Sequence, residues 1–133
     1  MGNRVQWIEH KGKRILFCDY ANIGDEEAFI QAIVETEKEV LKQAPGTLIL
    51  MLIDATGSRI TSRVTGRARE LAAKAREKDI PSSPTAVVGL SSPSQKAILT
   101  AMQFLRPDLH TAESIAAAKD WLVGRLSKFA TSE

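Results

Sequence analysis

Several features that mark common protein classes are missing from this sequence of 133 residues. Cys18 is the only cysteine, which excludes a disulfide within the chain and is typical of a reducing compartment. Aromatic residues make up 5% of the chain, too few for a surface that stacks on nucleic-acid bases. The 18 basic and 16 acidic residues give a net charge of +2, which does not favour nucleic acid or an anionic membrane as a partner.

Long hydrophobic runs are also missing. No apolar run approaches the ~18 residues that a membrane span needs, and residues 1–14 lack the apolar core of a secretory signal. The pattern for N-terminal myristoylation fails because Gln6 stands where serine or threonine is required. We therefore expect one cytoplasmic domain over residues 1–133, with Cys18 buried and unreactive in its apolar strand.

No catalytic or metal-binding pattern is visible. His10, His110 and Cys18 share no spacing typical of metal ligands. Residues 89–93 sit where a hydrolase keeps its nucleophile elbow, but Pro93 replaces the second glycine of that motif. Residues 55–58 lack the lysine of a phosphate-binding loop. The sequence predicts a protein without enzymatic activity, metal or cofactor, and a hydrolase is the remote alternative.

The chain is organised around the stretch Thr47–Thr61. Six consecutive apolar residues, 48–53, indicate a strand covered on both faces, as in a mostly parallel sheet. Asp54 ends this strand, which places its carboxylate at the carboxyl edge of the sheet, where α/β proteins bind ligands and partners.

The rest of the chain alternates strands and helices. The expected elements are a hairpin of 5–9 and 14–19, helices over 25–42 and about 58–78, a strand over 85–90, a helix after the capping box Ser92–Gln95, a short strand at 109–110, and a last helix capped by Thr111. This order predicts an α/β fold with a mixed, mostly parallel sheet of four or five strands and about four helices.

The second long helix has two contrasting faces. We expect close packing at Gly66 and along an apolar stripe of Val64, Ala68, Leu71, Ala72 and Ala75. The opposite face carries Arg59, Arg63, Arg67, Glu70 and Lys74. That face is either a partner-binding basic stripe or an ordinary solvated surface, and the intermixed acids favour the solvated surface. In the last helix, the spacing predicts that Ile115, Ala118, Leu122 and Leu126 face inward.

Four segments together resemble a known family. They are HKGKRILFCDY at 10–20, LILMLIDATGSRIT at 48–61, AVVGL at 86–90 and AESIAAAKDWL at 112–122. They resemble the SpoIIAA-like branch of STAS domains, small cytoplasmic bacterial proteins related to anti-anti-sigma factors. The resemblance implies a sheet of four or five strands surrounded by helices, and no enzymatic activity.

The resemblance also implies a regulatory turn. In anti-anti-sigma factors an Asp-Ser-Ser-Gly turn leads into the second helix, and a partner kinase phosphorylates its first serine. Here the turn is Asp54-Ala55-Thr56-Gly57, and Ala55 cannot be phosphorylated. Thr56 or Ser58 is an alternative acceptor near a helix N-terminus. The other interpretation is that both hydroxyls only satisfy backbone groups of the turn.

Two functional hypotheses follow. The first is a regulatory or protein-binding module whose unknown partner, or second copy, docks on the corner formed by Asp54, Thr56, Gly57, Ser58, Arg59 and Arg63. The second is a carrier or sensor of a small apolar or anionic ligand at the edge formed by the turn and by Ser91, Ser92 and Ser94. STAS domains are architecturally similar to CRAL-TRIO lipid-binding domains, and the alanines of 72–75 and 116–118 leave room either for close packing or for a ligand.

Overall fold

Five strands form one mixed sheet in the order in which they occur in the chain. The computed structural model describes residues 4–81, 83–90, 92–93, 95–97, 100 and 109–131, with side chains as far as Arg125 in the last helix. The strands are β1 (Val5–His10), β2 (Lys13–Asp19), β3 (Leu50–Asp54), β4 (Thr85–Val88) and β5 (Leu109–Ala112). β1 runs antiparallel to β2, and the other neighbours are parallel. The expected α/β fold with a mostly parallel sheet is confirmed.

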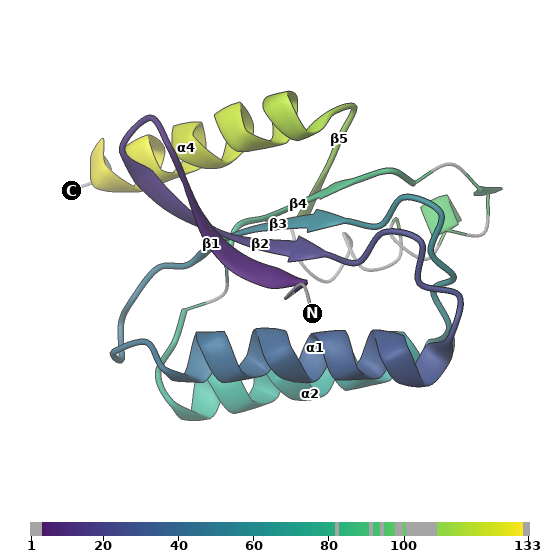
Figure 1. Ribbon diagram of the computed structural model, residues 1–133. Coiled ribbons are helices and arrows are strands. Elements are labelled where there is room, and N and C mark those ends of the chain that lie inside the picture. The colour runs from purple at the N-terminus through teal and green to yellow at the C-terminus, as the bar shows by residue number, and fades with distance from the viewer. Residues whose placement is uncertain are drawn as a thin grey trace.

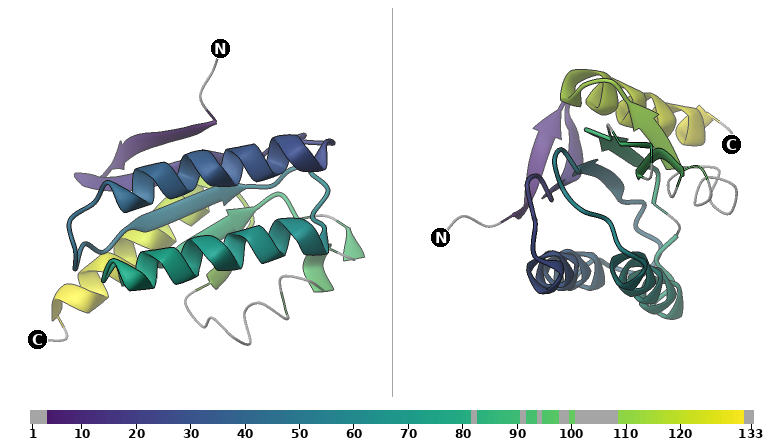
Figure 2. Two further views of the ribbon diagram at one scale, coloured as in Figure 1. Left: turned by 90° about the horizontal axis from the view of Figure 1, so that it is seen from below. Right: turned by 90° about the vertical axis from the view of Figure 1, so that its right-hand side faces the viewer.

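The helices cover both faces of this sheet (Figure 1). α1 (Glu26–Leu41) and α2 (Ser62–Glu77) lie side by side on one face, and α4 (Ile115–Thr131) crosses the other, as the end-on view in Figure 2 shows. Strands placed in chain order and joined by right-handed crossovers put their connecting helices on the same face. α1 and α2 therefore share one side. No helix within the described ranges is long and apolar enough to cross a membrane.

Local signals fix the ends of most elements. Lys11 and Gly12 have φ angles of 52° and 78°, which form the two-residue turn between β1 and β2. Asp25 caps α1 by accepting a hydrogen bond from the Ala28 amide at 3.0 Å. Thr61 caps α2 in the same way, accepting from the Val64 amide.

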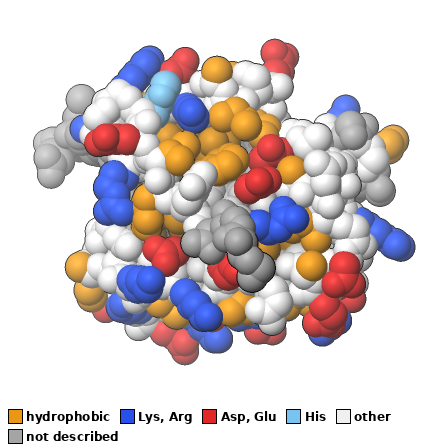
Figure 3. All heavy atoms as spheres, viewed as in Figure 1, with side chains coloured by type: hydrophobic (Ala, Val, Ile, Leu, Met, Phe, Trp, Pro, Cys, Tyr) orange, Lys and Arg blue, Asp and Glu red, His pale blue; other side chains and the backbone are white. Residues whose placement is uncertain are grey.

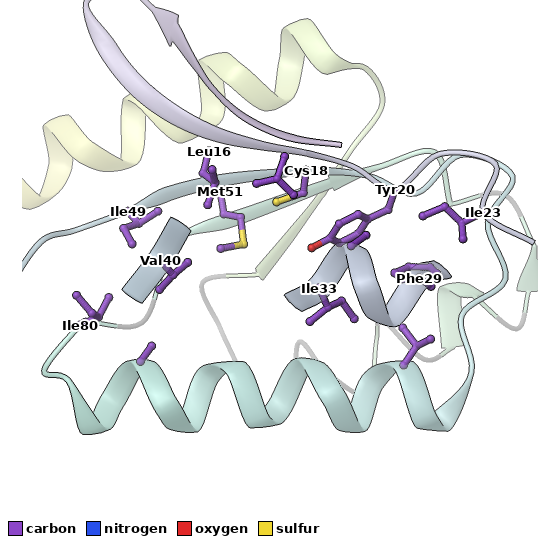
Figure 4. Close-up of a cluster of buried hydrophobic side chains, with 14 residues drawn as sticks. Leu16, Cys18, Tyr20, Ile23, Phe29, Ile33, Val40, Ile49, Met51 and Ile80 are labelled. Atoms are coloured by element: carbon purple, nitrogen blue, oxygen red, sulfur yellow. The ribbon is translucent and has the colours of Figure 1, made fainter. Parts of the chain in front are cut away.

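The core lies in two layers, one on each side of the sheet. On the α4 side, side chains with no exposed surface include Ile15, Leu52 and Leu122. On the α1 side, Cys18 and Tyr20 of β2 and the loop after it meet Phe29, Ile33 and Val40 (Figure 4). The expectation that Cys18 is buried is confirmed.

Two expectations about helices are wrong. Thr111 does not cap α4 but lies inside β5, which is longer than expected. Ser114 occupies the cap instead, and its hydroxyl accepts from the Ala117 amide at 3.1 Å. The helix therefore starts later, and Ile115, its first residue, is 37% exposed, whereas Ala118 and Leu122 face inward as expected. Leu126 lies outside the described side chains.

Gly66 of α2 is not a site of close packing. A Cβ built there meets no atom within 4 Å, so no neighbouring element requires the absence of a side chain. Of the expected stripe on this helix, only Val64 and Ala75 are buried. The inner face of α2 is thus packed less tightly than its sequence suggests.

Candidate functional site

The turn after β3 binds its own polar groups. Asp54 Oδ1 accepts hydrogen bonds from the Thr56 amide at 3.0 Å and from the Thr56 hydroxyl at 2.6 Å. This arrangement is typical of an aspartate that stabilises a tight turn. The carboxylate at the carboxyl edge of the sheet is therefore already engaged.

Neighbouring segments hold this turn from both sides. The Asn22 amide donates to the Thr56 carbonyl at 2.7 Å, and the Ala55 amide donates to the Val88 carbonyl at 2.9 Å. Gly89 lies so close that a Cβ on it would be 2.6 Å from the Thr56 nitrogen. Backbone hydrogen bonds to two neighbouring segments therefore hold the corner in place.

The position of the family's phosphoserine and the two alternative acceptors, Thr56 and Ser58, have different environments. Ala55, at the position of the family's phosphoserine, is 1% exposed. Ser58 is also buried; its hydroxyl donates to the Tyr20 carbonyl and accepts from the Ile23 amide. Thr56 is the one of the three that is exposed. The Ser58 hydroxyl thus satisfies backbone groups, as the second interpretation of the turn expects.

The basic face of α2 lies against α1. Arg67 Nη1 is 2.9 Å from Glu37 Oε2, and Lys74 Nζ is 3.3 Å from Glu37 Oε1. Arg63 pairs with Glu26 and Glu27 at the start of α1. The contacts of Glu37 with Arg67 and Lys74 lower the pKa of its carboxyl, mainly through the hydrogen bond from Arg67. Four of the five residues of this face are exposed, as expected for a solvated surface, and only Arg67 is half-buried. Because Arg63, Arg67 and Lys74 are ion-paired to α1, they do not form a free basic stripe.

The expected ligand edge is built around a capping box. The Gln95 amide donates to the Ser92 hydroxyl at 3.1 Å, and the Ser92 amide donates to Gln95 Oε1 at 3.3 Å. The Gln95 side-chain amide also donates to the Ser58 carbonyl. This helix start and the turn converge as expected, but the described polar groups there serve each other. Ser91 and Ser94 lie outside the described residues.

A cavity of about 740 Å³ lies between α2, α1 and the sheet. Its walls are mostly aliphatic, and three half-buried residues on α2, Ala68, Leu71 and Ala72, form one side. Ile53 and Val87 belong to the opposite wall, on the sheet. The alanines are too short to fill the space between helix and sheet. The alanines are visible in the sequence, where they are compatible both with close packing and with a ligand.

The polar side chains of Tyr20, Thr36 and Cys18 in this layer are buried and neutral. The Tyr20 hydroxyl is hydrogen-bonded to the Thr36 hydroxyl, and Thr36 also donates to the Ala32 carbonyl at 3.0 Å. Burial raises the pKa of Tyr20 well above its ordinary value, and it raises the pKa of the Cys18 thiol to about 11. Because burial disfavours the thiolate, Cys18 stays a protonated thiol near neutral pH, which agrees with the expectation that it is unreactive.

Charged groups meet the cavity at one end. Arg76 in the last turn of α2 and Asp79 just after it line the end nearest the starts of β3 and β4, together with Pro81 and Ser83. No sequence pattern signals this grouping, because it depends on where the end of α2 lies relative to the sheet. Ala55 and Ile60, next to the corner, line the opposite end.

The two histidines lie away from this cavity. His10 Nε2 is 2.8 Å from Asp120 Oδ1 of α4, and His110 stacks on Trp121 with ring centroids 4.4 Å apart. Both imidazoles thus have partners on the α4 side of the molecule. Within the described ranges, no group of three or more histidine, cysteine or acidic residues is arranged to hold a metal ion.

Comparison with protein-family models, curated proteins and solved structures found no match to this chain.

Proposed function

We propose that this protein is a cytoplasmic, non-enzymatic binding protein that holds an elongated apolar molecule in the cavity between α2 and the sheet. The observation that carries this proposal is the cavity itself. Ligand pockets have volumes of about 300–1,000 Å³ and mostly apolar walls, and 740 Å³ lies within that range. Protein cores rarely contain empty spaces much larger than a water molecule. A space of this size with aliphatic walls is therefore better explained by a ligand than by incomplete packing.

The direct test uses a neutral apolar probe. We expect Nile red to bind the protein with increased fluorescence and 1-hexadecanol to displace it. Replacing Ala72, a cavity-lining residue, with phenylalanine fills part of the space and should weaken Nile red binding at least tenfold. Ala73→Phe is the matched control, because Ala73 is exposed on the same helix and is not a lining residue. Absence of Nile red binding, or equal loss in both variants, would contradict the proposal.

The corner after β3 supports a second candidate function, binding of a protein partner. Asn22, Thr56 and Gly57 are exposed, and the backbone hydrogen bonds of the turn fix their positions. A preorganised surface loses little entropy on binding. This candidate keeps the role that the SpoIIAA-like resemblance implies, and that family assignment remains a prediction.

A variant of the exposed threonine tests this second candidate. We expect Thr56→Arg to abolish recovery of a specific partner with the tagged protein from its host, while Nile red still binds. If wild type and Thr56→Arg recover the same partner, the corner is not the docking surface.

A further inference from the structure

The two ends of the cavity differ in charge. Of the described residues that line it, only Arg76 and Asp79 are charged, and both are exposed at the same end. Apart from the thioether of Met51, the rest of the lining is aliphatic, aromatic or hydroxyl-bearing. The hydroxyls of Tyr20, Thr65 and Thr85 are hydrogen-bonded within the protein. A ligand with one polar end therefore fits in one orientation.

Arg76 differs from the other basic residues of α2 that were described above. Arg63, Arg67 and Lys74 are ion-paired to glutamates of α1. No ion pair joins Arg76 to an acidic side chain within the described part of the chain. A guanidinium at the mouth of an apolar cavity attracts an anionic oxygen group, which it can bind through two parallel hydrogen bonds.

The shape of the cavity favours a single chain. The lining residues of α2 run from Val64 to Arg76, which corresponds to about 18 Å along a helix. The space is thus long, with aliphatic walls beside the helix. An alkyl chain gains free energy in such a place with each methylene that leaves water.

We propose that the ligand is a single-chain amphiphile with a carboxylate head, such as a long-chain fatty acid. Its head lies at Arg76 and its chain extends beneath Ala72 and Ala68 toward Ala55. This inference rests on the proposed function, because it specifies the ligand of the same cavity. Asp79 stands beside the head and opposes its negative charge, so the site is tuned to one negative charge and disfavours a more highly charged head.

The experiment compares ligands that share a chain and differ in the head. Displacement of Nile red by palmitate, 1-hexadecanol and hexadecyltrimethylammonium is measured below the concentration at which each aggregates. We expect palmitate to bind more tightly than the alcohol, and the cation more weakly than either. Arg76→Gln should weaken palmitate binding about three- to tenfold and leave 1-hexadecanol unchanged. Asp79→Asn should strengthen palmitate binding about twofold.

Arg69→Gln is the control for Arg76→Gln. Arg69 is exposed on the same helix and is not among the lining residues, so its replacement should change neither ligand. Equal binding of palmitate and 1-hexadecanol, with no effect of Arg76→Gln, would overturn the head-group assignment while the proposed function stands. Failure of every ligand to bind would overturn both.

Discussion

Glycines in this chain have opposite roles, which the sequence alone does not distinguish. Gly89 has a φ angle of 86° and lies against the backbone of Thr56, so both conformation and space require glycine there. Gly66 is in the middle of α2 with open space around its Cα. One position is essential for the corner, and the other only weakens its helix.

We expect Gly66→Ala to raise the free energy of unfolding by about 0.5–1 kcal/mol. Alanine loses less backbone entropy than glycine when a helix forms, and no neighbour has to move to accept the methyl group. Thermal unfolding followed by circular dichroism measures this change. Nile red binding should stay the same, because Gly66 is not a lining residue. A destabilised variant would show that the helix is packed there after all.

We expect Gly89→Ala to lower the free energy of unfolding by about 2–4 kcal/mol. The left-handed conformation is unfavourable for alanine, and its methyl group would lie 2.7 Å from the Thr56 Cα atom. Urea unfolding of the variant measures the loss. A cost below 1 kcal/mol would indicate that the corner is flexible enough to move away from β4.

Among the elements, α1 and α2 are joined by ion pairs as well as by apolar contacts. Glu37 is 8% exposed although it is charged, and it binds both Arg67 and Lys74 of the neighbouring helix. Figure 3 shows acidic and basic side chains intermixed on the lower part of the molecule, where α1 lies. A buried carboxylate is tolerated only when it is paired in this way.

We expect Arg67→Gln to lower the free energy of unfolding by about 1–3 kcal/mol at neutral pH, because Glu37 loses its main hydrogen-bond donor. The pKa of Glu37 is lowered in the folded protein from its ordinary value of 4.5. The stabilisation is therefore complete above pH 4.5 and is lost as the pH falls through the lower folded value. Urea unfolding at several pH values should show the difference between wild type and variant shrinking below about pH 4.5.

Arg63→Gln is the control for this pH dependence. Arg63 makes exposed pairs with Glu26 and Glu27, which solvent screens, so its loss should change stability less than the loss of Arg67. If the two variants lower the free energy of unfolding equally, burial of the pair between Glu37 and Arg67 does not add to its contribution to stability.

For the molecule as a whole, the two helices that share one face of the sheet differ in how many side chains they bury. α1 has six buried residues, whereas α2 has only Val64 and Ala75. Segments with few buried apolar contacts open more readily than the rest of a domain. We expect the backbone amides of α2 to exchange hydrogen faster than those of α1. An apolar ligand such as palmitate should slow exchange in α2 selectively, as measured by mass spectrometry. Uniform exchange in both helices, unchanged by the ligand, would contradict the assignment of the cavity as a binding site.

The fold could be predicted because its signals are local. The apolar run ending at Asp54, the hairpin of 5–9 and 14–19 and the helix that starts near Asp25 each depend on a few neighbouring residues. The cavity, the Glu37 pair and the mouth at Arg76 depend on which helices lie side by side, and alternation of strands and helices does not encode that. The start of α4 was misplaced because both Thr111 and Ser114 are good capping residues, and only pairing with β4 assigns Thr111 to a strand.

The position of α4 has a consequence for synthesis on the ribosome. The face of the sheet with Ile15, Leu52 and Ala86 is covered by residues that follow β5, and α1 and α2 lie on the other side. While the chain emerges, strands β1 to β4 can pack against α1 and α2. The other face of the sheet stays exposed to solvent until Ala118 and Leu122 of α4 have been synthesised. The nascent protein therefore passes through a stage in which one face of the sheet is covered by helices and the other exposes apolar side chains. During this stage a chaperone has a defined apolar surface to bind.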